Sequence, residues 1–381
     1  MNADKRRYQK GFLSAFIGVY LRLILVFCAT AATPVSRDWH AHPAIVEIDT
    51  AARVFAVGDV HGDFDTFVAV LRSAGVIDKS NKWTGGATHL VQTGDCLDRW
   101  ADSRKVMDLL IKLEKQAERS HGMVHALLGN HEAMNMYGDL RYVTAGEYDS
   151  YRSGRSIQLR EHAYHVLADP EHRDDQEYRK KWFDEHPLGW VEHRQAFAAN
   201  GQYGRVLLER DAIVKVNDIL FLHGGISRKY VGTPIADLNS KIRGELKDFR
   251  LLNGGIVTDD QGPLWDRELA LGPELETAGL VDSILSAYGV SRIVVGHTPT
   301  TGAVTPRFGG KVILIDVGLS RAYNQSPACL IIEDGKLFAM HRGTKIPIPD
   351  GPDPSAYLKK AAEADPPGTN LRKALGVGEN R

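Results

Sequence analysis

Side chains of the kinds that bind metal ions are spread widely along the chain. They are two carboxylates, three imidazoles and one amide, namely Asp59, His61, Asp95, Asn130, His223 and His297. A structural zinc site would close with four ligands that are usually rich in cysteine, whereas oxygen and imidazole ligands suit Mn, Fe or Zn in catalytic sites. A ligand set of this size and composition therefore indicates two divalent ions rather than one.

The charge of such a site indicates an anionic substrate. Two divalent ions bring four positive charges, and Asp59, Asp95 and one bridging hydroxide return three negative charges. Arg99 adds positive charge, and arginine binds phosphate through two parallel hydrogen bonds. Two ions about 3.5–4 Å apart clamp the attacking and leaving oxygens of a displacement at phosphorus when one carboxylate bridges them. The pattern predicts hydrolysis of a phosphate ester, with Asp95 as the natural bridge.

Each candidate ligand follows an apolar run typical of a strand. Asp59 directly follows the run 53–58, and His61 lies two residues further on. Asp95 follows the run 89–94, and Asn130 follows the run 124–129. These positions are roughly one βαβ unit apart, and ligands bind beyond the carboxyl ends of the strands in an open α/β sheet. Residues remote in sequence are therefore expected to converge on one crevice. His131 adjoins Asn130 and, on an extended segment, would project in another direction, toward substrate.

The chain resembles the calcineurin-like metallophosphoesterases, because five short segments occur in that family's order: 58–62, 94–99, 129–132, 223–225 and 296–297. The Gly-Asn-His-Glu form of the third segment and the Asp-Arg pair of the second are similar to the phosphoprotein phosphatase branch. Residues 201–205, 216–223 and 262–267 look like the Shewanella-like phosphatases. The resemblance covers roughly residues 53–342. It implies an α/β fold of two packed mixed β-sheets flanked by helices.

The resemblance also implies roles for individual residues. Asp59, His61 and Asp95 would hold the first ion, and Asp95, Asn130, His223 and His297 would hold the second. His131 would be the general acid for the leaving alkoxide, oriented by Asp98, while Arg99 and Arg267 would bind phosphate oxygens. Metal-bound hydroxide would attack phosphorus directly, with manganese as the expected metal and iron or zinc as alternatives. An aspartate partner would fix the tautomer of His131 and raise its pKa.

The rest of the chain suggests one catalytic domain with additions. Residues 44–346 form this domain, and the polar segment 138–200 is interpreted as a mainly helical insert on the active-site side. Hairpins are expected about Asn217-Asp218 and Asp334-Gly335, with helices at 64–74 and 103–119. Residues 347–381, which are punctuated by proline and glycine, are expected to form a mobile tail.

The N-terminus has the pattern of a secretory signal. Lys5, Arg6, Arg7 and Lys10 precede an apolar stretch that ends in small residues suited to cleavage. Residues 1–32 are therefore a predicted signal peptide, followed by a linker at 33–43. Export, into a periplasm in a Gram-negative host, is the expected location. An uncleaved membrane anchor is the alternative, although Arg22 would be costly within a membrane.

The composition argues against nucleic acid as a partner, and more than one function is compatible with the sequence. The net charge of −1 gives no electrostatic footprint of nucleic-acid binding. The expected substrate is a phosphorylated protein or a small phosphate ester. One alternative is a small-molecule phosphohydrolase, such as one that cleaves dinucleoside polyphosphates. The other is a metal-free scaffold that kept the fold for protein binding, and the intact ligands, His131 and Arg99 argue against it.

Overall fold

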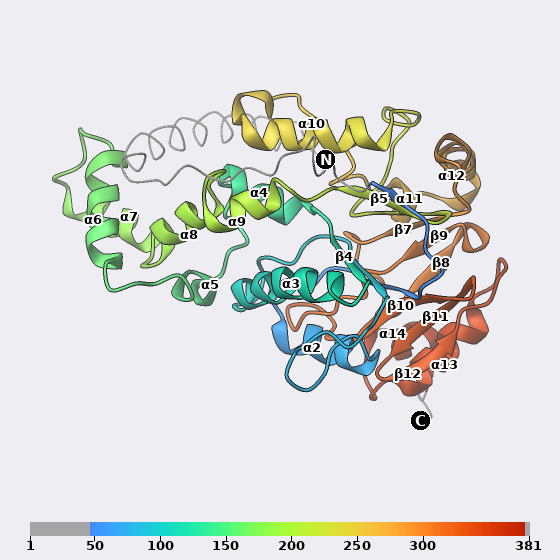
Figure 1. Cartoon of the computed structure of the whole chain (residues 1–381). Coiled ribbons are helices and arrows are strands. Elements are labelled where there is room, and N and C mark those ends of the chain that lie inside the picture. The colour runs from blue at the N-terminus through green and yellow to red at the C-terminus, as the bar shows by residue number, and fades with distance from the viewer. Residues whose placement is uncertain (1–45, 378–381) are drawn as a thin grey trace.

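The apolar runs before the candidate ligands form short strands in the computed structural model, which describes residues 46–377. They belong to two six-stranded mixed sheets (Figure 1). One sheet has the order β12 (Thr344–Pro347), β11 (Lys336–His341), β10 (Ala328–Glu333), β2 (Val54–Val57), β3 (His89–Gln92), β4 (Met123–Ala126). The other has the order β1 (Glu47–Ile48), β5 (Ile213–Val216), β6 (Ile219–Leu222), β7 (Arg292–Val295), β9 (Val312–Leu314), β8 (Thr305–Arg307).

The direction of the central strands positions the candidate site. Strands β2, β3 and β4 are mutually parallel, and so are β6, β7 and β9. Both sheets contribute to one hydrophobic core, in which Phe55, Leu90 and Phe221 have no exposed surface. The predicted pair of packed mixed sheets is therefore confirmed, and the carboxyl ends of strands from both sheets are available to one site.

Helices flank the two sheets. Around the first sheet and the insert they are α2 (Phe64–Ser73), α3 (Ser103–Glu118), α4 (Asn130–Tyr137), α5 (Ala145–Asp149), α6 (Ser156–Leu167), α7 (Gln176–Glu185), α8 (Trp190–Phe197) and α9 (Gln202–Leu207). Later in the chain come α10 (Ile235–Lys247), α11 (Glu268–Leu271), α12 (Glu274–Tyr288), α13 (Ser355–Ala364) and α14 (Asn370–Leu375). Short 3₁₀ turns lie at Phe249–Leu251 and Phe308–Gly310. Helix α3 packs against β4, and α10 packs against β5.

The segment predicted as a helical insert contains α5, α6, α7 and α8, which Figure 1 shows extending to one side of the sheets. Much of it is held by a hydrophobic cluster separate from the main core, formed by Tyr148, Ala163, Tyr164, Ala168, Trp182, Trp190 and Val191. The insert is joined to the catalytic region by Arg194, whose guanidinium donates to the backbone carbonyls of Asn135 and Met136 in α4. The insert therefore has its own core and a specific attachment beside the candidate site.

The C-terminal segment differs from the sequence-based expectation of a mobile tail. Residues 355–364 and 370–375 form α13 and α14, and Tyr357, Ala361 and Leu371 are buried. The Tyr357 hydroxyl donates to the carbonyl of Val304 at 2.9 Å. Asp365, between the helices, accepts from His341 on β11. The proline and glycine residues separate short helices that pack on the domain, so the prediction of a mobile tail was wrong.

Both expected hairpins form. Strands β5 and β6 pair about Asn217, and β10 and β11 pair about Asp334 and Gly335, with all three residues in the left-handed region that such turns need. The predicted signal peptide and linker lie outside the described residues. Among residues 46–377, no helix is both long and apolar enough to cross a membrane.

Candidate active site

The turns that carry the candidate ligands lie directly after strands, and several of their residues have uncommon backbone φ angles. His61, Asp95 and His297 have φ angles of 45°, 56° and 64°, a left-handed conformation that is uncommon for residues other than glycine. Glycines leave room for the carboxylates beside them: a Cβ atom on Gly129 would lie 2.2 Å from Asp95 Oδ1, and one on Gly296 would lie 2.6 Å from Asp59 Oδ1. Such backbone strain persists only where surrounding contacts enforce it, and it concentrates at functional sites.

Asp95 lies at the centre of the candidate ligands. Its Oδ2 atom is 3.8 Å from His61 Nε2, and its Oδ1 atom is 3.3 Å from His223 Nε2. Two sets of ligand atoms each lie within 4.8 Å of one another, His61 with Asp95 and His131, and Asp95 with His223 and His297. The two oxygens of Asp95 thus face different groups, which is the arrangement expected of a carboxylate between two ions.

The histidines are oriented by hydrogen bonds on the ring nitrogen that points away from the centre. His61 Nδ1 lies 3.0 Å from the carbonyl of Leu97, and His223 Nδ1 lies 2.9 Å from the carbonyl of Thr93. A carbonyl only accepts, so each Nδ1 carries a proton, and each Nε2 points toward Asp95. His297 is reversed, because its Nε2 lies 3.2 Å from the carbonyl of Trp265. Second-sphere contacts of this kind fix the tautomer of metal-binding histidines.

The protonation states also suit cations. Burial, and then His131, lowers the pKa of His61 to about 3, and burial with His223 lowers the pKa of His297 well below its usual value. Burial opposes ionisation of Asp95, but His223, His131 and His61 together hold its pKa well below the usual value. His61 and His297 are therefore neutral beside an ionised Asp95, and neutral imidazole and carboxylate are the forms that bind metal ions.

Two further features favour a cation at this site. His223 Nε2 lies 2.9 Å from the side-chain oxygen Oδ1 of Asn130 and 3.3 Å from Asp95 Oδ1. Burial, followed by the nearby carboxylates of Asp316 and Asp95, raises the pKa of Asp59 well above its usual value. A positive ion among these atoms would relieve the repulsion between the buried carboxylates, and His223, Asn130 and Asp95 offer it donor atoms that lie close together. The donor set therefore fits divalent metal ions.

His131 and Asp98 form a buried pair at the edge of the candidate ligands. His131 Nδ1 is 2.5 Å from Asp98 Oδ2, and its Nε2 is 3.7 Å from Asp95 Oδ2. Burial would lower the pKa of His131, but Asp95 and then Asp98 outweigh it and raise the pKa to about 8. His131 is therefore protonated near neutral pH, as a general acid for the leaving group must be.

His131 points away from Asn130 because of a helix, not because of the extended segment expected from the sequence. Asn130 and His131 begin helix α4 and do not lie on an extended segment. Consecutive residues point in different directions around a helix as well, so Asn130 still faces His223 while His131 faces Asp98. The two side chains diverge because a helix starts here, and the prediction of strand alternation was wrong.

The two arginines predicted to bind phosphate lie on different sides of the site. The Arg99 guanidinium carbon is 4.0 Å from the ring centre of Tyr142 and 5.7 Å from that of Tyr323. The ring of Tyr323 is in turn 5.3 Å from that of His61. Arg267 Nη1 donates to the carbonyl of His297 at 2.8 Å and to the Thr298 hydroxyl at 3.0 Å. Both therefore supply positive charge close to the candidate ligands.

Several residues that hold the site in place were not predicted from the sequence. Glu132 accepts hydrogen bonds from the backbone amides of Asp95, Cys96 and Gly129, and so ties the turn after β3 to the start of α4. An acidic residue at the third position of a helix commonly bonds to the amide before the first turn, so this contact had a signal in the sequence. Tyr142 and Tyr323 had none, because only the folded chain brings them to Arg99.

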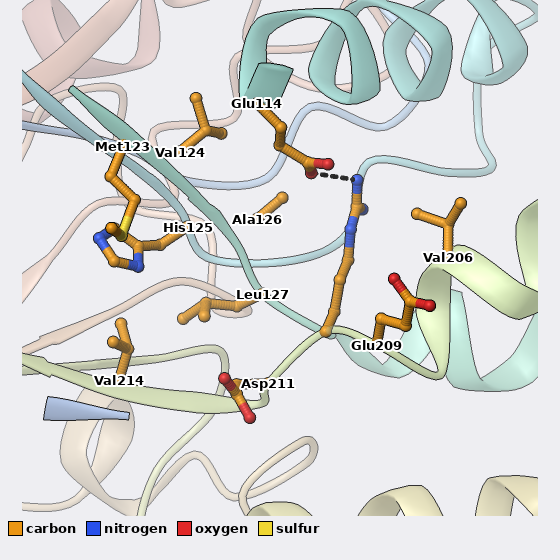
Figure 2. Close-up of a pocket in the computed structure, with 11 residues that line it drawn as sticks. Glu114, Met123, Val124, His125, Ala126, Leu127, Val206, Glu209, Asp211 and Val214 are labelled. Atoms are coloured by element: carbon orange, nitrogen blue, oxygen red, sulfur yellow. Dashed lines mark hydrogen bonds and ion pairs between the residues drawn. The ribbon is translucent and has the colours of Figure 1, made fainter. Parts of the chain in front are cut away.

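One cavity of about 230 Å³ lies away from this site, along the edge strand β4 (Figure 2). It is lined by residues of β4 with Glu114 of α3 and Val206 of α9, and by none of the predicted site residues. Glu114, which is labelled in Figure 2, accepts a hydrogen bond through Oε1 from the guanidinium of the buried Arg210 at 3.2 Å. This ion pair links α3 to the segment before β5.

Known proteins resemble this chain in sequence and in structure. Residues 52–300 match the family model described as calcineurin-like phosphoesterase. The chain is 30% identical over 288 residues to Shewanella-like protein phosphatase 2 of Arabidopsis thaliana, covering 71% of this chain and 72% of that protein. It is 26% identical over 299 residues to Shewanella-like protein phosphatase 1 of Plasmodium berghei, covering 76% and 74%.

Among solved structures, the chain is similar to the cold-active protein-tyrosine phosphatase of a psychrophilic Shewanella species. The TM-score is 0.64 at 26% identity, and the match covers 84% of this chain and 88% of that protein. The family model matches well over half of the chain and spans all of the turns that carry the candidate ligands. The chain therefore belongs to the calcineurin-like phosphoesterase family and is a metal-dependent phosphatase.

Proposed function

We propose that the protein is a two-metal phosphomonoesterase that removes phosphate from phosphorylated proteins, with Mn²⁺ as its working metal. The observation that carries this proposal is the convergence on Asp95 of His61, His223 and His297, beside the His131–Asp98 pair. The names of the similar phosphatases from Arabidopsis, Plasmodium and Shewanella support a protein substrate.

Each side chain has a defined part in the proposed reaction. Asp59, His61 and Asp95 would hold one ion, and Asp95, Asn130, His223 and His297 would hold the other. The ions, when bound, supply Lewis acidity and neutralise charge on the phosphate. Arg99 and Arg267 orient the phosphate oxygens. His131 Nε2 gives its proton to the leaving oxygen, while Asp98 accepts the hydrogen bond from His131 Nδ1–H throughout and stabilises the charged imidazole.

Metal content and substrate choice test this proposal together. Purified protein is expected to hold about two divalent ions per chain, and to hydrolyse phosphopeptides faster than dinucleoside polyphosphates when assayed with Mn²⁺. A chelator should abolish both reactions, and Mn²⁺ should restore them. Protein that folds without metal and hydrolyses neither substrate would support the scaffold alternative. A preference for dinucleoside polyphosphates would favour the small-molecule hydrolase instead.

We further propose that the protein is exported and that residues 1–32 are removed as a signal peptide. The proposal is supported by the basic N-terminus and the apolar stretch that follows it. Mass spectrometry of protein from its native host should then find a mature N-terminus near Ala32 or Thr33. An intact N-terminus in the soluble cytoplasmic fraction would contradict export, whereas the same N-terminus in membranes would indicate an anchor.

A further inference from the structure

The turn that carries Asp98 and Arg99 is held in an uncommon conformation. Both residues have a φ angle of 68°, so two consecutive residues other than glycine are left-handed. Such conformations cost on the order of 1–3 kcal/mol each and persist only where neighbouring groups enforce them. Within the turn, the Asp98 amide donates to the Ser103 hydroxyl at 3.0 Å. From α4, His131 and Asn135 contact the Asp98 carboxylate, and further contacts to this turn come from the insert.

Tyr142, at the start of the insert, contacts Arg99 and His131. Its carbonyl accepts from the Arg99 amide at 3.0 Å, and the Arg99 guanidinium lies over its ring at 4.0 Å from the ring centre. The centres of the Tyr142 and His131 rings are 5.0 Å apart, with their planes tilted by 32°. The Arg99 Nε atom is buried and has no hydrogen-bond partner among the described residues. The ring face is therefore a main restraint on this guanidinium.

Helix α5 packs closely behind the same turn. A Cβ atom on Gly146 would lie 2.7 Å from the Cβ of Ala101, so the helix approaches the turn as closely as glycine allows. Arg104 Nη1, just beyond the turn, donates to the carbonyl of Ser150 at 2.6 Å. Glu147 on α5 has no exposed surface and lies near Asp98 and Ser103. The insert thus contacts the turn and the residues just beyond it through α5 as well as through Tyr142.

From these contacts we infer that Tyr142 is a positioning residue for the phosphatase reaction, which holds Arg99 in line with the phosphate and His131 in line with the leaving group. This inference rests on the proposed function. A cation over an aromatic face contributes up to about 2 kcal/mol when water is excluded, which corresponds to roughly 30-fold in binding. The alternative is that Tyr142 only fills space between the insert and the domain.

The test compares Tyr142→Leu, which removes the ring, with Tyr142→Phe, which keeps it. Tyr142→Leu is expected to weaken binding of inorganic phosphate, measured by calorimetry with Mn²⁺ present, by about 10- to 30-fold, because Arg99 is no longer held. It should also lower kcat for an alkyl phosphate more than for an aryl phosphate, because His131 is displaced. Tyr142→Phe should stay within about threefold of the wild type in both measurements, because the ring face remains.

Two controls separate this role from packing and from the proposed function. Tyr178→Leu makes the same change within the insert, on α7, and should leave phosphate binding unchanged. In an Arg99→Ala background, Tyr142→Leu should weaken phosphate binding no further, since residues that act through one another are not additive. An additive loss, or equal effects at Tyr142 and Tyr178, would overturn the inference. If Tyr142→Leu does not fold, Tyr142→Gln serves the same comparison. A wild-type protein that hydrolyses no phosphate ester would instead contradict the proposed function.

Discussion

Replacing Asp95 with asparagine is expected to abolish phosphatase activity, with a loss of about 10³-fold or more in kcat/KM. Asp95 is the only one of the candidate ligands that belongs to both of the ligand sets in the described structure. Its amide counterpart keeps the size of the side chain but removes the negative charge shared by two ions. Metal ions supply several kcal/mol of transition-state stabilisation, and about 1.4 kcal/mol corresponds to tenfold in rate.

Metal analysis distinguishes this effect from general damage. Asp95→Asn should lower the content of both ions, whereas Asp59→Asn should affect mainly one of them. Asp65→Asn is a suitable control, because Asp65 lies on α2 and is exposed, with an ion pair to Arg321. That control should retain both ions and normal turnover. An Asp95→Asn variant with two bound metals and near-normal turnover would rule out the bridging assignment.

The second large effect is expected for His131→Asn, which should slow hydrolysis of alkyl phosphates by roughly 10²–10⁴-fold, the usual contribution of a general acid. Aryl phosphates should be affected less, because their leaving groups need little protonation. The pKa of His131 is raised to about 8, so the acid form is present below this pH and is lost above it. The wild-type kcat for alkyl phosphates should therefore fall as the pH rises through about 8, and the variant should lack this decline.

The measurement is a pair of pH–rate profiles, one for each substrate type, together with the metal content. His131→Asn is expected to keep its metals, since His131 is the proposed acid and not a proposed ligand. Asp98→Asn should act in the same direction, because it removes the partner of His131 Nδ1. His121→Asn, at an exposed left-handed position outside the site, is the matched control. Equal losses on alkyl and aryl phosphates would remove His131 from the acid role.

The positions of residues that follow strands were predictable, because apolar runs in the sequence mark the strands and the sheet topology places the ends of parallel strands together. The turns that contain Asp59, Asp95 and His223 follow apolar runs, and the topology of parallel strands then brings them together. The hairpin at Asp334-Gly335 was predictable for a similar reason, since its turn residues favour the left-handed region. In these cases a local pattern determines the outcome.

Other features depend on contacts that no local pattern encodes. Tyr142 lies in a polar segment, and its place against Arg99 follows from how the insert folds back on α4. In the C-terminal segment, proline and glycine were interpreted as signs of mobility. The apolar residues Tyr357, Ala361 and Leu371 were too few for a clear helical pattern, yet they are buried against the domain. Tertiary packing determined both results.

The separate core of the insert has a consequence for behaviour on heating. The cluster around Tyr164 and Trp182 is small and distinct from the core shared by the sheets, so the insert is able to open before the domain unfolds. Arg194 and Tyr142 connect it to α4 and to the Asp98–Arg99 turn. We therefore expect a temperature range in which the sheets remain intact while turnover has already ceased, so that the working temperature of this enzyme depends on its insert.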